Sequence, residues 1–286
     1  MNNFLSFYQH LPEHLNPTAF SLGFFSVQWY SLMYLAAFAA VYFLLKYRVR
    51  KKETDFNLDL VWDIIWHSVL GVIIGGRLGY VLFYNLGHFL SHPVEIISPF
   101  DQAGNYIGLY GMSYHGGLIG VILAMLILVR KKRITFLKLA DFMIPAIPAG
   151  YFFGRLGNFL NGELYGRLTK KSWGMYFYDG SVWQLRHPSQ LYEAILEGVL
   201  LFLVFWTMRN KKWMQGYFLP AYLFGYGFVR LLAEFFREPD PQVGYLFGFL
   251  TLGQLFSLAM IVAAGILFLR KNGQWKADFK IDKNNV

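Results

Sequence analysis

Seven long apolar runs dominate the sequence and limit what the chain can fold into. A helix needs about 20 apolar residues to cross about 30 Å of hydrocarbon. Runs of that length lie at residues 22–45, 62–86, 108–129, 138–161, 188–208, 216–236 and 248–269. The fourth is interrupted by Asp141, Pro145, Pro148 and Arg155, which a span tolerates where it faces protein or a cavity. The pattern therefore predicts an all-α, polytopic integral membrane bundle of seven transmembrane helices.

The composition agrees with lipid as the solvent. Hydrophobic residues make up 56% of the chain and charged residues only 15%, too few to cover a soluble protein of 286 residues. The chain has no cysteine, which excludes a disulfide framework, a thiolate metal site and a cysteine nucleophile. No basic segment precedes an apolar core at the N-terminus, so no cleavable signal is expected.

The basic residues indicate the orientation of the spans. The formal net charge of +9 would suit nucleic acid, but most basic residues form short clusters between apolar runs, which is typical of membrane proteins. The clusters follow the first, third, fifth and seventh spans, so the positive-inside rule makes their side cytoplasmic. We therefore expect the N-terminus outside and residues 270–286 as a cytoplasmic tail. Residues 1–286 are expected to form one transmembrane catalytic domain with a small extracytoplasmic loop region, chiefly residues 162–187.

Four arginines stand apart from these clusters, towards the outer ends of the spans. They are Arg77, Arg155, Arg230 and Arg237. Each costs at least about 2.5–3.5 kcal/mol at membrane depth, so each needs a partner or an aqueous pocket. The carboxylates expected nearby are Glu163, Glu193 and Glu234. The resulting excess of positive charge suits an anion, and the planar guanidinium suits phosphate especially.

A structural interpretation of the same arginines stays open. Arg230 and Glu234 are spaced i, i+4 and would form an ion pair on one helix. Arg237 lies one turn further out and could reach the interface by itself. Arg77 could equally be a tightly paired structural residue.

Residues 154–166 hold the densest group of polar side chains. Arg155 and Asn158 are spaced i, i+3 and share one helix face, where a guanidinium and an amide could bind phosphate and ester oxygens together. Gly154 and Gly157 are better explained by close helix packing. Asn161, followed by glycine, is typical of a helix end.

Three further positions each allow two interpretations. His115, followed by two glycines, is either a satisfied core residue or a proton carrier that a ligand approaches closely. His187 precedes a proline that opens a helix, so it is either a cap or a ligand contact. Tyr30 follows a tryptophan and is either an interface anchor or a site residue. No motif with metal-ligand spacing occurs, so neither a metal nor another cofactor is expected.

These motifs resemble one family, the bacterial prolipoprotein diacylglyceryl transferases. The likeness rests on residues 154–166 and is supported by Trp29-Tyr30, residues 75–80, 115–117 and 187–193, and Arg230 through Arg237. The motifs occur in the family's order across nearly the whole chain.

The resemblance implies a reaction: the diacylglyceryl group of phosphatidylglycerol moves to the thiol of a lipobox cysteine in a preprolipoprotein, releasing glycerol 1-phosphate. It also implies a location in the bacterial cytoplasmic membrane, with the active site facing outward, and no nucleic-acid partner. The expected catalytic residues are His115, Arg230, Tyr30 and Glu234. The expected substrate-binding residues are Arg155, Asn158, Arg77, Asn161, Glu163, Gly166, Arg237, Tyr226 and His187.

Two other classes of function fit the composition. A transporter for an organic or phosphorylated anion would also hold arginines in the membrane, but its site would lie near the midplane and its helices would form inverted repeats. A purely structural membrane scaffold would not explain so many polar residues at depth.

Overall fold

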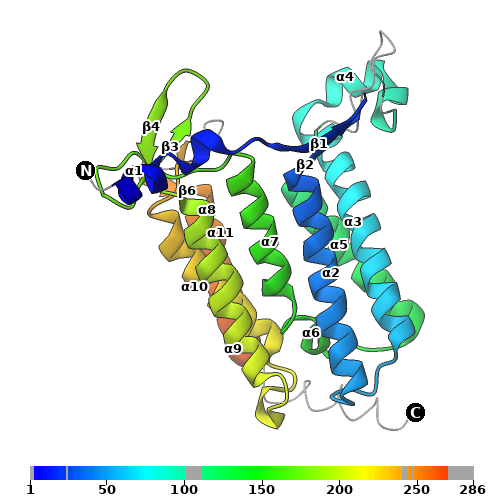
Figure 1. Cartoon of the computed structure of the whole chain (residues 1–286). Helices are drawn as coiled ribbons and strands as arrows, with labels where there is room; N and C mark the ends of the chain where they lie inside the picture. Colours follow the sequence, from blue (N-terminus) through cyan, green and yellow to red (C-terminus); the bar gives the residue numbers. More distant parts are fainter. Residues whose placement is uncertain are drawn as a thin grey trace. The chain divides into compact units, whose positions relative to one another are not determined.

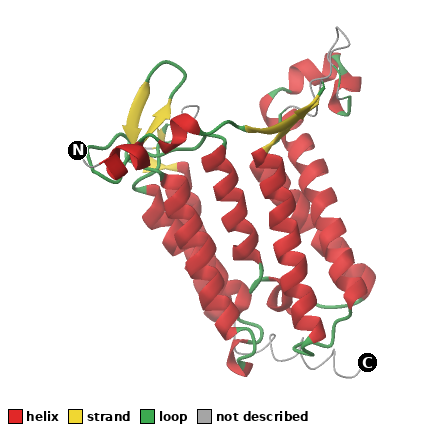
Figure 2. Cartoon of the chain, viewed as in Figure 1, coloured by secondary structure: helices red, strands yellow, loops and turns green. Residues whose placement is uncertain are grey.

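The computed structural model describes residues 3–23, 25–98, 100, 111–239, 244–246 and 248–269. The chain forms two compact units, Met1–Arg48 with Ala140–Val286, and Val49–Leu139. Each unit is described by itself (Figures 1 and 2). The expected cytoplasmic tail, residues 270–286, and the first residues of the expected span 108–129 lie outside the described residues. The single catalytic domain stays a prediction.

Two long antiparallel helices form the second unit. They are α3 (Leu58–Tyr84) and α5 (Tyr114–Lys132), and between them lie α4 (Leu86–Ser91) and the 3-10 turn η2 (Pro93–Ile96). The Asn57 side chain caps α3 by accepting from the Leu60 N–H, and Ser113 caps α5 by accepting from the Gly116 N–H. The histidine motif therefore begins a helix.

Glycines let α3 and α5 approach each other closely. A Cβ built on Gly71 would lie 2.8 Å from the carbonyl oxygen of Gly120, and one on Gly79 would lie 2.7 Å from the Gly116 Cα. Neither backbone position can give way, so both contacts require glycine. Gly116, which follows His115, is therefore part of the helix packing.

The first unit contains most of the remaining helices. The N-terminal ones are α1 (Asn3–Gln9), the 3-10 turn η1 (Leu11–His14) and α2 (Trp29–Arg50). The others are α6 (Phe136–Met143), α7 (Ile147–Leu160), α8 (Ser189–Glu193), η3 (Ala194–Leu200), α9 (Leu201–Met208), η4 (Lys212–Met214), α10 (Phe218–Glu234) and α11 (Leu252–Leu269). The helix α8 continues through the π-helical turn η3 into α9, which makes one segment of 20 residues.

The fourth expected span is bent. The helices α6 and α7 meet at 59° across a short break, where the sequence places Pro145. Proline lacks an N–H and disfavours helical backbone in the residue before it, so the helix is interrupted there. The bend lies before Arg155, which is therefore carried by α7 alone.

Three small hairpins modify the expectation of an all-α fold. The strands pair as β1 (Thr18–Leu22) with β2 (Phe25–Gln28), β3 (Met175–Tyr178) with β4 (Trp183–Arg186), and β5 (Tyr245–Leu246) with β6 (Leu250–Thr251). The first span was expected to begin at residue 22, but residues 18–28 form β1 and β2 and the helix begins at Trp29. Thr18, Phe20 and Val27 favour strands, and Gly23 turns the chain with a φ of +62°.

Residues 162–187, expected as an outer loop, fold with the N-terminal helices. Phe159, Met175 and Phe177 form a buried core on which the side chains of α1 and η1 pack. At the tip of the β3–β4 hairpin, Asp179 accepts hydrogen bonds from the backbone N–H groups of Val182 and Ser181 at 3.0 Å. These bonds lower the pKa of the Asp179 carboxyl. We call residues 3–15 and 162–187 the head.

The helices are apolar and present large hydrophobic side chains outward. Five of them are long and apolar enough to cross a membrane, and the bent α6–α7 pair makes up to six. The helix α10 (17 residues) is not among these helices, so the sixth expected span, residues 216–236, and with it the total of seven stay predictions. Trp66 on α3 is 60% exposed and Leu203 on α9 is 54% exposed, which water would disfavour. The chain is therefore a multi-pass membrane protein.

Within the first unit, the C-terminal ends of α2 and α9, which carry basic residues, lie close together. Arg48, near the end of α2, donates to the carbonyl oxygens of Asp141 and Phe142 at 3.0 and 2.6 Å, and to that of Arg209 at 3.5 Å. The ends of α2 and α9 therefore lie together, as the expected topology requires. The orientation of this end in the membrane stays a prediction.

Candidate active site

A fully buried carboxylate, Glu193 at the end of α8, is the centre of the polar residues in the first unit. Its Oε2 lies 2.8 Å from Nε of Arg155 on α7 and 2.6 Å from Nη1 of Arg230 on α10. Its Oε1 lies 3.5 Å from Nη1 of Arg237. One carboxylate thus joins three guanidinium groups from three segments. A buried charge needs such partners, because leaving it unpaired costs several kcal/mol.

Arg230 contacts two further buried carboxylates. Its Nη1 lies 3.6 Å from Glu197 and its Nη2 lies 2.8 Å from Glu234 one helical turn away. The Thr251 hydroxyl donates to Glu234 at 2.9 Å. The expected i, i+4 pair of Arg230 and Glu234 is confirmed, within a larger network.

Arg155 begins a second line of contacts, along α7. Its Nε and Nη2 donate to the Tyr151 hydroxyl at 2.8 and 2.6 Å, and its Nη1 donates to the Asn158 amide oxygen at 3.3 Å. Asn158 Nδ2 donates to the Glu163 carboxylate at 2.9 Å, and Tyr226 donates to the Tyr151 hydroxyl at 3.3 Å. The expected shared face of Arg155 and Asn158 is confirmed.

Backbone contacts connect this network to the head. Gly166 and Arg237 form an isolated β-bridge, and the Gly166 N–H donates to the His187 carbonyl at 2.8 Å. A Cβ on Gly166 would lie 2.7 Å from that same carbonyl oxygen. Gly166 therefore acts through its backbone, by allowing three chain segments to meet.

The His187 ring lies in the head and contacts Tyr192. Its Nδ1 is 3.1 Å from the Tyr192 hydroxyl, and the ring packs against that of Phe236 at 5.2 Å. Burial lowers the pKa of His187, so its neutral form is favoured. The helix α8 begins at Ser189 with Pro188 as its N-cap residue, so His187 is not the capping residue that the sequence suggested.

Two other expected site residues of the first unit lie beside α7. The Tyr30 hydroxyl is 3.1 Å from that of Tyr34, and a Cβ on Gly157 would lie 3.2 Å from the Tyr30 ring. Gly157 thus serves helix packing, as its spacing indicated. Asn161 ends α7, its N–H donating to the Gly157 carbonyl at 3.0 Å.

Arg77 and His115 belong to the second unit. Arg77 is buried and donates to three backbone carbonyls, those of Ile96 at 2.8 Å, Glu95 at 2.5 Å and Gly111 at 3.3 Å. These contacts agree with the structural interpretation of Arg77, and substrate binding by it stays a prediction. His115 is the second residue of α5; it is exposed and its ring meets that of Tyr114 edge-on.

The sequence reasoning missed Glu197 and Tyr151 and misjudged the balance of charge. Glu197 is fully buried beside Arg230 and was not singled out, although a carboxylate four residues after Glu193 in an apolar run is a costly feature that could have drawn notice. Glu193, Glu197 and Glu234 balance the three arginines formally. The excess of positive charge expected around these arginines is therefore not found among the described residues of this network.

The comparisons with known proteins show which family the chain belongs to. The family model "Prolipoprotein diacylglyceryl transferase" matches residues 17–270. The chain belongs to this family. A protein of Chlorobaculum tepidum named phosphatidylglycerol–prolipoprotein diacylglyceryl transferase is 47% identical over 97% of this chain and 98% of its own. Similar proteins of the same name are 40% identical in Campylobacter hominis, over 98% of this chain and 100% of theirs, and 47% identical in Bordetella avium, over 89% and 94%.

Proposed function

We propose that this chain transfers the diacylglyceryl group of phosphatidylglycerol to the lipobox cysteine thiol of preprolipoproteins. The observation that carries the proposal is the near full-length match to a relative named for this activity, at 47% identity. The buried arginine network supports it, because guanidinium groups suit the phosphate ester of the lipid.

The reaction is a substitution at a glyceryl carbon. The substrate thiol supplies the nucleophile, since the chain has no cysteine. The thiolate sulfur forms a bond to the glyceryl carbon that carries the phosphate ester, and the carbon–oxygen bond breaks. The electron pair stays on the phosphate oxygen, so glycerol 1-phosphate leaves, and the thiol proton passes to a base.

We assign the residues of the first unit by their contacts. Arg155 and Asn158 bind the head group as a joined guanidinium and amide. Arg230 and Arg237 stabilise the charge that grows on the leaving phosphate, and Glu193 holds both of them in place.

The remaining assignments concern position and proton transfer. Glu234 orients Arg230 by their 2.8 Å contact. Glu163 and Tyr30 orient the head group or the glyceryl carbon. His115 is our candidate for accepting the thiol proton, because histidine is the common proton carrier in catalysis.

The membrane topology is part of the proposal. Seven spans in a bacterial cytoplasmic membrane would place the N-terminus and the head outside and residues 270–286 in the cytoplasm. The meeting of the basic ends of α2 and α9 through Arg48 supports this arrangement. The active site would then face the side on which exported preprolipoproteins present their cysteine.

A transfer assay with purified protein tests the activity and the assignments. Detergent-solubilised protein, labelled phosphatidylglycerol and a lipobox peptide are combined, and the peptide's gain of a diacylglyceryl mass is followed by mass spectrometry. Arg230→Ala should lower kcat at least about 10²-fold, the usual cost of one donor to a developing charge. Arg155→Ala should raise the KM for phosphatidylglycerol about 10–100-fold, because it removes charged hydrogen bonds to the head group. The exposed Arg130 on α5 provides a control, and Arg130→Ala should transfer at the wild-type rate.

His115→Gln tests proton transfer separately. Loss of a general base costs about 10²–10⁴-fold, and higher pH should partly restore the rate because more thiol ionises unaided. His14→Gln, at another exposed histidine, should leave the pH profile unchanged. A His115→Gln deficit that is equal at every pH would assign a positioning role instead. Tracer uptake into proteoliposomes without lipid turnover would favour the transporter.

A further inference from the structure

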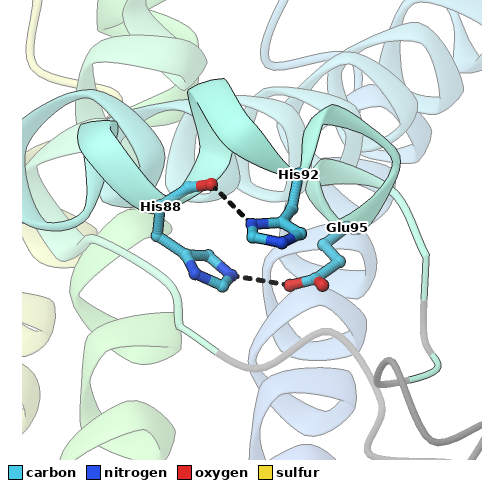
Figure 3. A group of neighbouring side chains, drawn as sticks. All are labelled: His88, His92 and Glu95. Atoms are coloured by element: carbon cyan, nitrogen blue, oxygen red, sulfur yellow. Dashed lines mark hydrogen bonds and ion pairs between the residues drawn. The ribbon is translucent and has the colours of Figure 1, made fainter.

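Three potential metal ligands converge in the second unit, outside the residues assigned to the reaction. His88 on α4, His92 directly after it and Glu95 on η2 place one ligand atom each within 4.8 Å of one another. His88 Nε2 lies 2.7 Å from Glu95 Oε2, and the two imidazole rings stack with centroids 4.8 Å apart. Figure 3 shows both rings and the carboxylate gathered on one side of this segment.

The spacing along the chain explains why the three side chains share a side. Residues 88 and 92 are one helical turn apart, and residue 95 follows after one further turn. His92 Nδ1 lies 3.1 Å from the His88 carbonyl oxygen, which can only accept, so Nδ1 carries the proton. The Nε2 of His92 then presents its lone pair, the state that a metal ligand needs.

Buried contacts hold the segment that carries these ligands. Arg77 donates to the carbonyl oxygens of Glu95 and Ile96, which fixes the backbone of η2. The same guanidinium lies 4.9 Å from the ring centroid of the buried Phe89, the residue after His88. The contacts of Arg77 therefore hold in place the backbone that carries the ligands, as a metal site requires.

We propose that His88, His92 and Glu95 bind a divalent transition-metal ion of the zinc type. Two imidazoles and one carboxylate are the ligands that Zn²⁺ accepts in tetrahedral sites with an open fourth position, which water fills. The oxygen-preferring ions Mg²⁺ and Ca²⁺ suit such a donor set poorly. The ion replaces the His88–Glu95 hydrogen bond and links α4 to η2 through its ligands. The sequence predicts no metal here, because the spacing of His88, His92 and Glu95 matches no familiar motif and Glu95 lies on η2, beyond the helix that carries His88.

Zinc binding to the full-length protein in detergent tests the proposal. The protein is purified through a cleaved tag, stripped with chelator and titrated with Zn²⁺ against a chromophoric competitor. We expect one high-affinity ion per chain, and at least about 100-fold weaker binding in His88→Ala/His92→Ala and in Glu95→Gln, since loss of even an outer-shell partner costs about 10–100-fold.

A second histidine–carboxylate pair provides the matched control. His10 Nδ1 lies 2.6 Å from Glu13 Oε1, with side-chain exposures of 36% and 28%, close to the 39% and 23% of His88 and Glu95. No third ligand joins it within the described residues. His10→Ala should therefore bind zinc like the wild type. Equal loss in His10→Ala and the site variants would overturn the proposal, as would wild-type affinity in the site variants.

Hydrogen exchange shows whether a variant that binds no zinc is simply misfolded. In the wild type, Zn²⁺ should slow amide exchange across residues 86–97 and leave α3 and α5 unchanged. The metal-free variants should match the metal-free wild type in both helices. If zinc binds but exchange at 86–97 does not slow, the ion is held elsewhere and the assignment fails.

Discussion

Replacing Glu193 by glutamine should destabilise the first unit more than any comparable change at a surface carboxylate. The side chain is fully buried and lies 2.6–3.5 Å from three guanidinium groups. Glutamine keeps the shape but removes the charge, which leaves three buried cations facing two carboxylates. Breaking a buried pair in this way costs about 3–5 kcal/mol. At about 2–4 °C per kcal/mol, the unfolding midpoint should fall by roughly 6–20 °C.

Tryptophan fluorescence during heating at a fixed scan rate measures that shift. Glu13→Gln is the matched control, because Glu13 pairs with His10 at 2.6 Å in a solvent-accessible position. An exposed pair is worth at most about 1 kcal/mol, so the control should shift by less than about 4 °C. Equal midpoints for the two variants would refute the view that Glu193 holds the arginines by charge.

Four further outcomes follow from the same contacts. Arg155→Lys keeps the charge but loses the planar fork that binds the head group, and should raise the KM for phosphatidylglycerol about 10-fold in the transfer assay. Gly166→Ala places a methyl group against the His187 carbonyl, which should cost about 1–3 kcal/mol and speed amide exchange in the head. Burial lowers the pKa of His187, so the stability that its neutral form gives is complete above the ordinary pKa of about 6.5 and is lost as pH falls below that value. Between about pH 7.5 and 5.5, the unfolding midpoint should therefore drop less in His187→Gln than in the wild type. Glu197→Gln replaces a buried carboxyl that lies 3.6 Å from Arg230 and should lower the KM for phosphatidylglycerol in the same assay, because the phosphate then has one competitor fewer.

Contacts within one helix were predictable from the sequence. Arg155 and Asn158 lie three residues apart and Arg230 and Glu234 four, and both pairs are joined in the structure. The helical period alone determines such neighbours. The apolar runs likewise predicted the helices, because lipid requires long uncharged stretches.

Contacts between segments were not predictable in the same way. Glu193 meets arginines 38 residues before it and 37 and 44 residues after it, and no local pattern encodes those partners. The prolines near the start of α7 indicated the bend. The hairpin at residues 18–28 was not predicted, because its residues are typical of strands and of membrane helices alike. Arg77 was expected to need a partner, and among the described residues it donates to backbone carbonyls, which no local sequence pattern encodes.

The formal balance of charge between three arginines and three buried carboxylates bears on the proposed phosphate binding. Among the described residues, Arg155, Arg230 and Arg237 lie close to Glu193, Glu197 and Glu234. On the proposed assignment, an arriving phosphate competes with a carboxylate for a guanidinium, and we expect Glu197 to be displaced first because its contact with Arg230 is 3.6 Å against 2.6 Å for Glu193. A balanced network can stay folded in the membrane without its substrate, which an unpaired arginine cluster could not do cheaply. We therefore expect the carboxylates to occupy the place of the lipid phosphate until it binds, and Glu197 to be the one that it displaces.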